Sequence, residues 1–386
     1  DALSRSVGGH RADPVTLVVA PARGRYSQTF VRDHVANLPG EVALLFGRAY
    51  KLETEDGTPL ISERSNGLAR LAGVIGRSAA VRKRAKSDAV ARFCREHAVG
   101  VALAEFGPTA ASISGDLARA GVPLVAHFHG YDAYERETLD EWSGRYRNMF
   151  ERDTEVVVVS DHMREQLVSL GAPADRIHLV RVGVDVTRFS GGDPATAPPH
   201  FLVIGRFVEK KAPMRAVEAF AVALESQPDA RLTMVGDGPL LEGTRARVRS
   251  LGLEEAVELR EPASSDEVAE LMRGARGLIQ ASVTASTGDR EGTPVVVMEA
   301  MSSGLPVVGT RHTGIGEIVE DERTGLLSEE HDTQAMGANI VRLAADPELA
   351  ARLGSTGAAV ARERHSLADS IAALSEVLEM ARARGG

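Results

Sequence analysis

The stretch Glu291-Gly-Thr-Pro-Val-Val-Val-Met-Glu-Ala-Met-Ser-Ser-Gly-Leu-Pro-Val-Val308 decides the fold class, because a predicted helix leads directly into a short apolar strand. Thr293 can cap the helix by accepting a hydrogen bond from a free backbone N–H, and Pro294 suits the first helical position. We therefore expect a helix that begins at about Pro294. Its unpaired N–H groups and positive dipole end favour a bound phosphate.

The same alternation extends over the whole chain. Short Val/Ile/Leu runs alternate with longer amphipathic stretches, which is typical of parallel sheets covered by helices. Residues 190–199 are rich in Pro and Gly, which break regular structure, and we interpret them as a linker between two similar halves. The sequence therefore predicts an α/β fold with two Rossmann-like domains. The expected strands are 15–20, 41–46, 122–128, 156–160, 177–181, 201–205, 231–235, 257–260, 277–280 and 306–308.

Composition places the chain among globular proteins. Its 386 residues exceed one ordinary domain. The single cysteine, Cys94, excludes an internal disulfide and a cysteine metal cluster, and it fits a reducing compartment. No apolar run approaches the roughly 18 residues that span a bilayer, and the start lacks the apolar core of a secretory signal. We expect a cytoplasmic protein.

Charge is unevenly distributed. The net charge of -9 argues against general nucleic-acid binding. The stretch 70–95 is nevertheless strongly basic, with Asp88 as its one acid. Such a stretch can contact an anionic membrane surface, as a peripheral protein of the inner membrane face would, or a phosphorylated acceptor. A solvated helix face is the alternative interpretation, and both stay open.

Candidate ligand-binding residues follow the predicted strands, where open parallel sheets bind ligands. Arg206 and Lys211 combine a guanidinium fork with a mobile ammonium group, which suits a diphosphate. Backbone N–H groups at glycines can approach or bind phosphate, although each of these glycines can equally serve a tight turn. The glycines in question are Gly24, Gly236, Gly314 and Gly316.

Carboxylates and a histidine complete the candidate set. Glu291 and Glu299 accept hydrogen bonds when ionised and so suit sugar or ribose hydroxyls, with Gly292 and Thr293 in the same loop. The alternative for each glutamate is an ordinary surface acid. His129 lies at the carboxyl end of a predicted strand and therefore beside the expected cleft. Asp132 could orient His129, receive a substrate hydroxyl or cap the next helix.

Missing motifs narrow the chemistry. The sequence has no Gly-x-x-x-x-Gly-Lys-[Ser/Thr] loop, and no Gly-x-Gly-x-x-Gly follows the first strand. Histidine and acid spacings offer no zinc site. We therefore expect no metal, because the basic residues and the helix dipole can neutralise a leaving phosphate.

Taken together, these motifs resemble the retaining glycosyltransferases of the GT-B fold that are grouped as glycosyltransferase family four. First-domain motifs are similar to the branch that builds bacterial exopolysaccharides, colanic-acid-type transferases included. Gln28, Ala212 and Gly316 depart from the usual family pattern, which concerns local loop geometry. The segments that carry the resemblance are 27–30, 127–132, 183–185, 205–211, 235–239, 291–294, 299–307, 314–319 and 324–327.

The resemblance implies a fold in which two Rossmann-like domains face each other across a cleft. Residues 1–190 would form the acceptor-side domain, 200–365 the nucleotide-sugar domain, and 366–386 a helix that returns to the first domain. Arg206 and Lys211 would hold the donor diphosphate. Glu299 would bind the ribose, Glu291 the transferred sugar, and His129 a sugar hydroxyl near the reacting carbon.

The function implied is transfer of a sugar from a UDP- or GDP-sugar to an acceptor hydroxyl, with retention of configuration and without a cofactor. A saccharide, a lipid-linked saccharide or a small molecule could be the acceptor, in glycan or glycoconjugate biosynthesis. The alternatives are a GT-B phosphorylase, a sugar-nucleotide epimerase and, outside enzymes, a two-domain sugar-binding protein.

Overall fold

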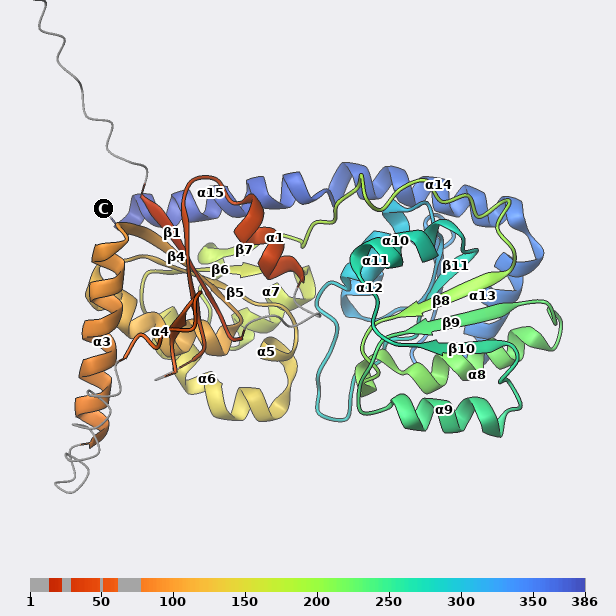
Figure 1. The fold of residues 1–386 in the computed structure, drawn as a ribbon, viewed down its shortest axis with the longest axis horizontal. Coiled ribbons are helices and arrows are strands. Elements are labelled where there is room, and N and C mark those ends of the chain that lie inside the picture. The colour runs from red at the N-terminus through yellow and green to blue at the C-terminus, as the bar shows by residue number, and fades with distance from the viewer. Residues whose placement is uncertain (1–13, 23–28, 49–50, 62–77, 386) are drawn as a thin grey trace, which may run out of the picture.

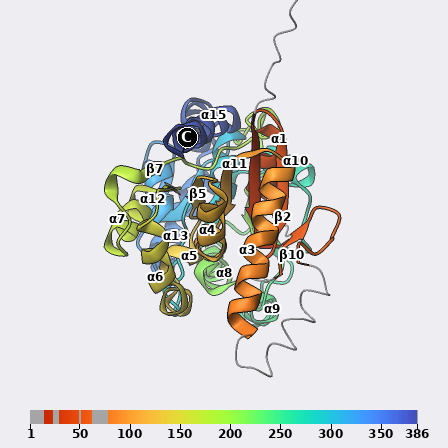
Figure 2. The same ribbon diagram turned by 90° about the vertical axis from the view of Figure 1, so that its left-hand side faces the viewer.

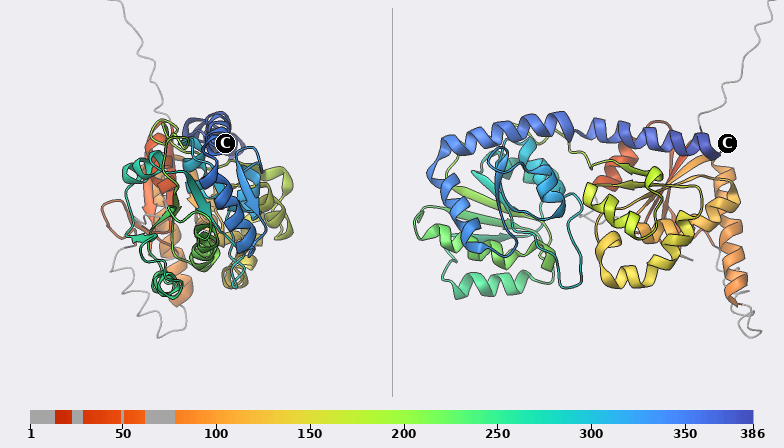
Figure 3. Two further views of the ribbon diagram at one scale, coloured as in Figure 1. Left: turned by 90° about the vertical axis from the view of Figure 1, so that its right-hand side faces the viewer. Right: turned by 180° about the vertical axis from the view of Figure 1, so that it is seen from behind.

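The computed structural model describes residues 14–22, 29–48, 51–61 and 78–385. It consists of two α/β lobes that lie side by side, as Figure 1 shows. Two long helices at the end of the chain run along one edge of both lobes, which the view from behind in Figure 3 shows most clearly. The predicted fold class, two parallel-sheet Rossmann-like domains, is confirmed. The domain limits expected from the sequence stay predictions.

The first sheet has the strand order β3-β2-β1-β4-β5-β6-β7. Its strands are parallel apart from β3, which pairs antiparallel to β2. Every residue of β1 is buried, as expected for a strand covered on both faces. The strands are β1 (Val15–Ala20), β2 (Val42–Phe46), β3 (Glu53–Thr54), β4 (Val99–Glu105), β5 (Leu124–His127), β6 (Thr154–Val158) and β7 (Ile177–Leu179).

Helices cover this sheet on both faces, and α3 stands at the outer end of the lobe in Figure 2. Ser160 caps α7 by accepting a hydrogen bond from the backbone N–H of Met163 at 3.2 Å. The helices are α1 (Thr29–Asn37), α3 (Ser78–Glu96), α4 (Gly107–Ala120), α5 (Tyr131–Tyr134), α6 (Arg136–Phe150) and α7 (Asp161–Ser169), with a 3₁₀ turn η1 (Ala174–Arg176).

The second sheet is fully parallel, with the order β10-β9-β8-β11-β12-β13. Its strands are β8 (His200–Ile204), β9 (Arg231–Val235), β10 (Val257–Arg260), β11 (Gly277–Gln280), β12 (Val307–Thr310) and β13 (Gly325–Ser328). The helices that follow in the chain are η2 (Glu209–Lys211), α8 (Pro213–Leu224), α9 (Leu241–Ser250), α10 (Ser265–Arg273), α11 (Val295–Ser302), α12 (Thr313–Ile318), α13 (Thr333–Ala345), α14 (Pro347–Arg364) and α15 (Leu367–Gly385).

The last helix, α15, packs against the first sheet although it follows the second domain in the chain. Leu374 and Leu378 of α15 join Leu103 and Val125 of the sheet in one buried apolar cluster. Arg384 also pairs with the buried Glu155 of β6. Burial of this apolar stripe is the main force that holds the helix on the first lobe.

Each sheet has a point where the strand order reverses, between β1 and β4 and between β8 and β11. Pairing of β8 with β11 is limited to Phe201 with Gly277 and Leu202 with Leu278. The two strands therefore separate towards their carboxyl ends. That separation leaves room for a ligand at the place where this topology binds one.

Three local predictions are wrong. Thr293 does not cap α11, because Pro294 occupies the N-cap position and the helix begins at Val295. The strands β4 and β13 were not expected from the sequence. Lys86, within the basic stretch, is buried and binds Asp116 at 3.0 Å, so it does not contribute to a charged surface.

The first part of the basic stretch, residues 70–77, lies outside the described residues. Lys83 and Arg84 on α3 are exposed. Across the described residues, no helix combines the length and the apolar character that crossing a membrane requires. Contact of this stretch with a membrane stays a prediction.

Candidate functional site

A hollow opens where β8 and β11 separate. It is bounded by the segment 203–207 after β8 and by the end of β11, with Arg206 and Lys211 at its wall. Arg206 is exposed, and Lys211 ends the turn η2. The two cations predicted to hold a diphosphate, Arg206 and Lys211, thus line the same hollow. The lining residues are Val203, Ile204, Gly205, Arg206, Phe207, Lys211, Pro213, Ile279, Gln280 and Ala281.

Lys211 connects this hollow to the loop before α11. Its Nζ lies 2.9 Å from Oε1 of Glu291, which is only 6% exposed. Burial alone would raise the pKa of Glu291, but the neighbouring ammonium groups of Lys211 and Lys210 hold it below its ordinary value. Glu291 is therefore an anion beside the hollow, able to accept hydrogen bonds from hydroxyls.

Lys210, the neighbour of Lys211, is held by contacts with the loop before α11. Its Nζ binds Asp289 at 3.0 Å and the carbonyl of Arg290 at 3.3 Å. Burial would lower the pKa of Lys210, yet Glu291 and Asp289 outweigh burial and raise it. Lys210 therefore fixes the loop that carries Glu291.

His312 holds the same loop from the other side. Its Nε2 accepts a hydrogen bond from the backbone N–H of Glu291 at 3.1 Å. Its Nδ1 then carries the proton and faces Oε1 of Glu330 at 2.6 Å. Glu291 is thus held through its backbone by His312 and through its side chain by Lys211. The role of His312 was not predicted from the sequence.

Three of the predicted glycines provide close backbone approach. A Cβ on Gly292 would lie 2.2 Å from the carbonyl oxygen of His129, and one on Gly314 would lie 1.7 Å from the carbonyl oxygen of Gly292. A Cβ on Gly236 would lie 1.9 Å from the carbonyl oxygen of Gly205. Gly316, in contrast, faces open space, and Gly24 lies outside the described residues.

The approach of Gly292 to His129 brings the two domains into contact. Thr293, instead of capping its helix, donates a hydrogen bond across the boundary to the carbonyl of Val159 at 2.6 Å. Glu317 of α12 accepts hydrogen bonds from the backbone N–H groups of Asp161 and His162, both at 3.0 Å. The two loops predicted to face each other are therefore in direct contact.

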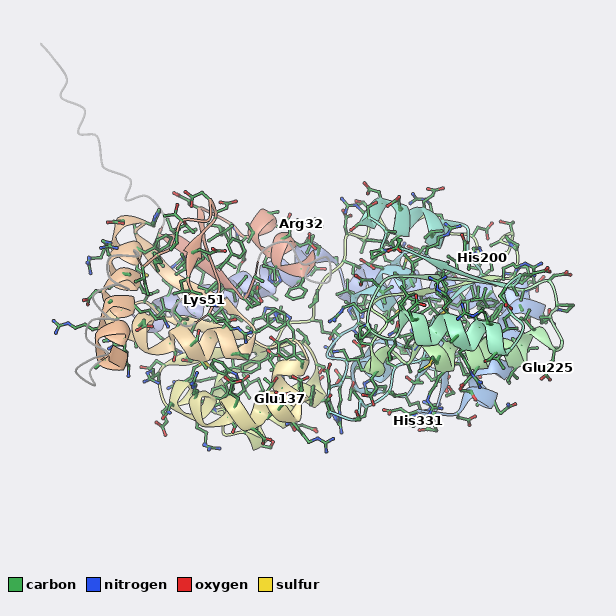
Figure 4. All side chains as sticks on the ribbon, turned by 60° about the horizontal axis from the view of Figure 1, so that its bottom comes forward. Arg32, Lys51, Glu137, His200, Glu225 and His331 are labelled. Carbon is green, nitrogen blue, oxygen red and sulfur yellow. The ribbon has the colours of Figure 1, made fainter. Side chains whose placement is uncertain are left out.

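Side chains near this boundary come from both lobes. Figure 4 shows the side chains of both lobes; the labelled Arg32 and Glu137 belong to the first lobe, and the labelled Glu225 marks the end of the second lobe that is far from the boundary. Arg136 reaches from α6 to the carbonyl of Ser286, and its backbone N–H donates to the carbonyl of Thr287 at 2.9 Å. Several polar contacts thus hold the lobes together beside the site.

His129 lies at the first-domain side of this boundary. Its Nε2 is 2.7 Å from Oε2 of Glu105, and its ring stacks on Phe30 with 4.1 Å between the ring centroids. Burial, and next the neighbouring His127, lower the pKa of His129 to about 3. The ring is therefore neutral at physiological pH.

Asp132 orients the backbone that carries His129. Its carboxylate accepts hydrogen bonds from the N–H groups of Gly107 at 2.9 Å, His129 at 3.1 Å and Gly130 at 2.8 Å. It is fully buried, and burial raises its pKa to about 6. Of the roles considered for Asp132, orientation of the His129 loop is the one that these contacts support.

Glu105 is the acidic residue that the sequence did not reveal. It ends β4 beside the strand-order reversal of the first sheet, with no exposed surface. Besides His129, its carboxylate contacts His34 and His127. The apolar run from Val101 to Ala104, ended by an acid, was the available signal for a buried strand with a polar residue at its carboxyl end.

Glu299, on α11, is influenced by other charged groups than Glu291. These groups are Asp33 of α1 and Arg188. Burial, and next the Asp33 carboxylate, raise the pKa of Glu299 to about 7, while Arg188 acts in the opposite direction. The structure brings together Arg206, Lys211, Glu291 and the His129 loop; the roles expected for these residues and for Glu299 stay predictions.

Two family models match consecutive parts of the chain. Residues 59–188 match the model described as Glycosyltransferase Family 4. Residues 189–360 match the model described as Glycosyl transferases group 1. The boundary between them falls just before the predicted linker.

Curated relatives carry names from exopolysaccharide biosynthesis. WcaL of Escherichia coli strain K12, whose name refers to a glycosyltransferase of colanic acid biosynthesis, is 36% identical over 64% of this chain and 62% of its own length. The amylovoran biosynthesis glycosyltransferase AmsK of Erwinia amylovora is 32% identical over 57% of this chain and 54% of its own. The match thus spans about three fifths of the length of these relatives.

Solved structures share the fold at low sequence identity. HepE of Anabaena, crystallised with UDP, superimposes with a TM-score of 0.72 at 16% identity, over 95% of this chain and 100% of the other. Sucrose-phosphate synthase from Thermosynechococcus elongatus gives a TM-score of 0.72 at 18% identity, over 96% and 100%.

Proposed function

We propose that the chain, whose two parts match family models of glycosyltransferases, transfers a sugar from a nucleoside diphosphate sugar to an acceptor hydroxyl in exopolysaccharide biosynthesis. One observation supports the proposal most directly. Arg206 and Lys211 line a hollow at the strand-order reversal of the second sheet, and Lys211 contacts the buried Glu291 at 2.9 Å. A cation pair for a diphosphate and an acid for a sugar hydroxyl are thus adjacent.

Each group has a part in the reaction. The bond between the sugar C1 and the phosphate oxygen breaks, while the acceptor oxygen bonds to C1 on the same face and its proton moves to the leaving phosphate oxygen. Arg206 and Lys211 stabilise the charge that develops on that phosphate. Glu291 orients the sugar. Configuration is retained because the acceptor attacks the face that the phosphate leaves, and no separate protein base is required because the leaving phosphate oxygen takes the proton.

The donor and its requirements are proposed in the same terms. A UDP- or GDP-sugar is the expected donor, because the relatives are named for polysaccharide biosynthesis and HepE was crystallised with UDP. The two cations replace a metal ion at the diphosphate, so neither a metal nor another cofactor is required. Turnover is therefore expected to persist in the presence of EDTA.

Substitution of Lys211 tests the proposal. Lys211→Ala should lower kcat about 10²- to 10³-fold, because a donor of transition-state stabilisation is lost. Sugar release from a panel of UDP- and GDP-sugars with saccharide acceptors measures this effect. Arg245→Ala on α9, which removes only a pair with Glu242 at 3.4 Å, is the matched control and should leave kcat unchanged.

Product analysis separates the alternatives. A phosphorylase would require inorganic phosphate, and an epimerase would convert the sugar nucleotide without any acceptor. NMR of the product's anomeric proton distinguishes retention from inversion. Donor binding without turnover of any donor–acceptor pair would support the sugar-binding alternative and refute the transferase.

A further inference from the structure

A cluster of three histidines surrounds Glu105 at the strand-order reversal of the first sheet. Oε1 of Glu105 lies 2.7 Å from Nδ1 of His34, and Oε2 lies 2.7 Å from Nε2 of His129. Nδ1 of His127 is 3.2 Å from Oε2, but it does not have hydrogen-bond geometry. The exposed fraction is 0% for the Glu105 side chain and 7% for that of His129. Within the pair of Glu105 and His129, only the His129 side chain is therefore exposed to solvent.

The charge state of Glu105 determines where the protons lie. Burial alone would raise its pKa, but His34 and His127 hold the pKa well below its ordinary value. An ionised carboxylate only accepts hydrogen bonds. Both imidazole nitrogens that face it at 2.7 Å must therefore carry a proton. Since His129 is neutral, its other nitrogen, Nδ1, has a free lone pair.

We propose that Glu105 is a positioning residue that fixes His129 as its neutral Nε2–H tautomer, so that Nδ1 accepts a hydrogen bond from a hydroxyl of the bound donor sugar. The inference rests on the proposed transferase function and extends it. His34 holds the second carboxylate oxygen, and Phe30 holds the ring by stacking. The carbonyl of His129 meets Gly292 of the nucleotide-sugar domain, so a fixed ring is presented at the domain boundary.

A neutral acceptor is the useful form at this place. Positive charge develops on the sugar ring as the glycosidic bond breaks, and a protonated imidazole nearby would oppose it. Burial keeps His129 neutral, while the carboxylate selects the tautomer. The two effects together provide an acceptor without a cation.

A metal ion is the competing occupant of the cluster. His34, Glu105 and His127 lie close enough to share one. Zinc ligands at about 2.0–2.1 Å in tetrahedral geometry are about 3.3 Å apart, whereas His34 and Glu105 are 2.7 Å apart. The short separation favours a hydrogen bond.

Nitrogen NMR of the histidine side chains tests the tautomer directly in the wild-type protein, with His129→Asn used for assignment. We expect Nε2 of His129 to be protonated and Nδ1 to be unprotonated across about pH 5 to 8. A proton on Nδ1 would overturn the proposal. So would one equivalent of bound divalent metal in the purified protein, measured by mass spectrometry, because ligation needs the lone pairs that the proposal assigns to N–H groups.

Glu105→Gln tests the effect on turnover. Its amide cannot accept from both imidazoles as the carboxylate does, so kcat/KM should fall about tenfold, the loss of one hydrogen bond. The matched control is Glu155→Gln, because Glu155 is a buried acid of the same sheet that binds His178 at the same 2.7 Å. This control should retain wild-type kcat/KM despite a comparable loss of thermal stability.

The double variant shows whether Glu105 acts through His129. Glu105→Gln should have no further effect on kcat/KM in a His129→Asn background. Equal kcat/KM for Glu105→Gln, Glu155→Gln and wild type would refute the inference and leave the proposed function intact. If wild type turns over none of UDP-glucose, UDP-galactose and GDP-mannose with saccharide acceptors, the proposed function fails for these donors, and the wild-type NMR result still decides the tautomer.

Discussion

The two strand-order reversals share one topology but differ in what fills them. Between β1 and β4 the protein places its own carboxylate, Glu105, which has no exposed surface, and packs imidazole rings around it. Between β8 and β11 it leaves a hollow with Arg206 and Lys211 at the wall. One reversal is thus closed and internally neutralised, whereas the other is open and cationic.

The difference assigns separate tasks to the two sheets. Within the described residues, the first reversal holds the Glu105 carboxylate against the ring of His129, so it can orient that residue. The second reversal has two cationic side chains at the wall of its hollow, which suits the diphosphate proposed above. Glu291 pairs with Lys211 at 2.9 Å and is therefore an acid beside this hollow. The proposed site therefore combines a closed half at Glu105 with an open, cationic half at Arg206 and Lys211.

Among the variants that test this comparison of the two halves, one that moves the halves apart should lower kcat/KM most. Gly292→Ala places a Cβ 2.2 Å from the carbonyl oxygen of His129, so the loops must move apart. We expect kcat/KM to fall about 100-fold, the size that a displacement of about 1 Å produces. Gly144→Ala on α6 is the matched control, since its Cβ meets nothing within 4 Å. Equal activity of the two variants would contradict a functional contact between the loops.

A smaller effect is expected at the polar contact between α12 and α7. Glu317 accepts from two backbone N–H groups at the start of α7 and binds Arg181 at 2.9 Å. Glu317→Gln removes the charge from these hydrogen bonds, so the lobes should separate more readily and KM should rise about threefold to tenfold.

Hydrogen exchange of Asp161 and His162 measures this separation directly and should become faster in Glu317→Gln. Glu322→Gln is the control, because Glu322 binds Arg342 within the same lobe at 2.7 Å. Unchanged exchange at the start of α7 would show that the contact does not hold the lobes together.

Much of the fold follows from local sequence patterns. Both Rossmann-like halves were predicted from alternating apolar runs, because parallel strands buried on both faces are apolar throughout. The strand β4 was missed, although Val101 to Ala104 are apolar and fully buried. Its run follows a charged helix almost directly and is interrupted by Gly100, so its beginning is poorly marked, although Gly107-Pro108 marks its end.

The site was less predictable than the fold, since it depends on contacts between distant residues. Lys211 and Glu291 could each be proposed as site residues, because each lies in a motif at the end of a predicted element. The contact of Glu105 with His34 could not, because neither residue lies in such a motif and only the folded chain brings them together. Thr293 shows the same limit: its position suited a helix cap, but in the folded chain its hydroxyl bonds to Val159 of the other domain. For residues such as Thr293, local chemistry allowed more than one role, and only the tertiary contacts show which role the residue has.

The smallest expected effect is on the pH dependence of stability, and it comes from the different pKa shifts of Glu291 and Glu299. Lysines lower the pKa of Glu291, whereas burial and the nearby Asp33 raise that of Glu299 from its ordinary value near 4.5 to about 7. Between these two pH values the folded protein binds more protons at Glu299 than the unfolded chain does. Stability must therefore fall as pH rises through this window.

Glu299→Gln should remove this dependence. Its melting temperature should match that of wild type near pH 5 and exceed it by about 2 °C near pH 8, as measured by calorimetry. Asp33→Asn should act in the same direction, because it removes the carboxylate that opposes ionisation of Glu299. If the melting temperatures of wild type and Glu299→Gln change with pH in parallel across this range, Glu299 has an ordinary pKa. The proposed difference in environment between Glu291 and Glu299 would then be wrong.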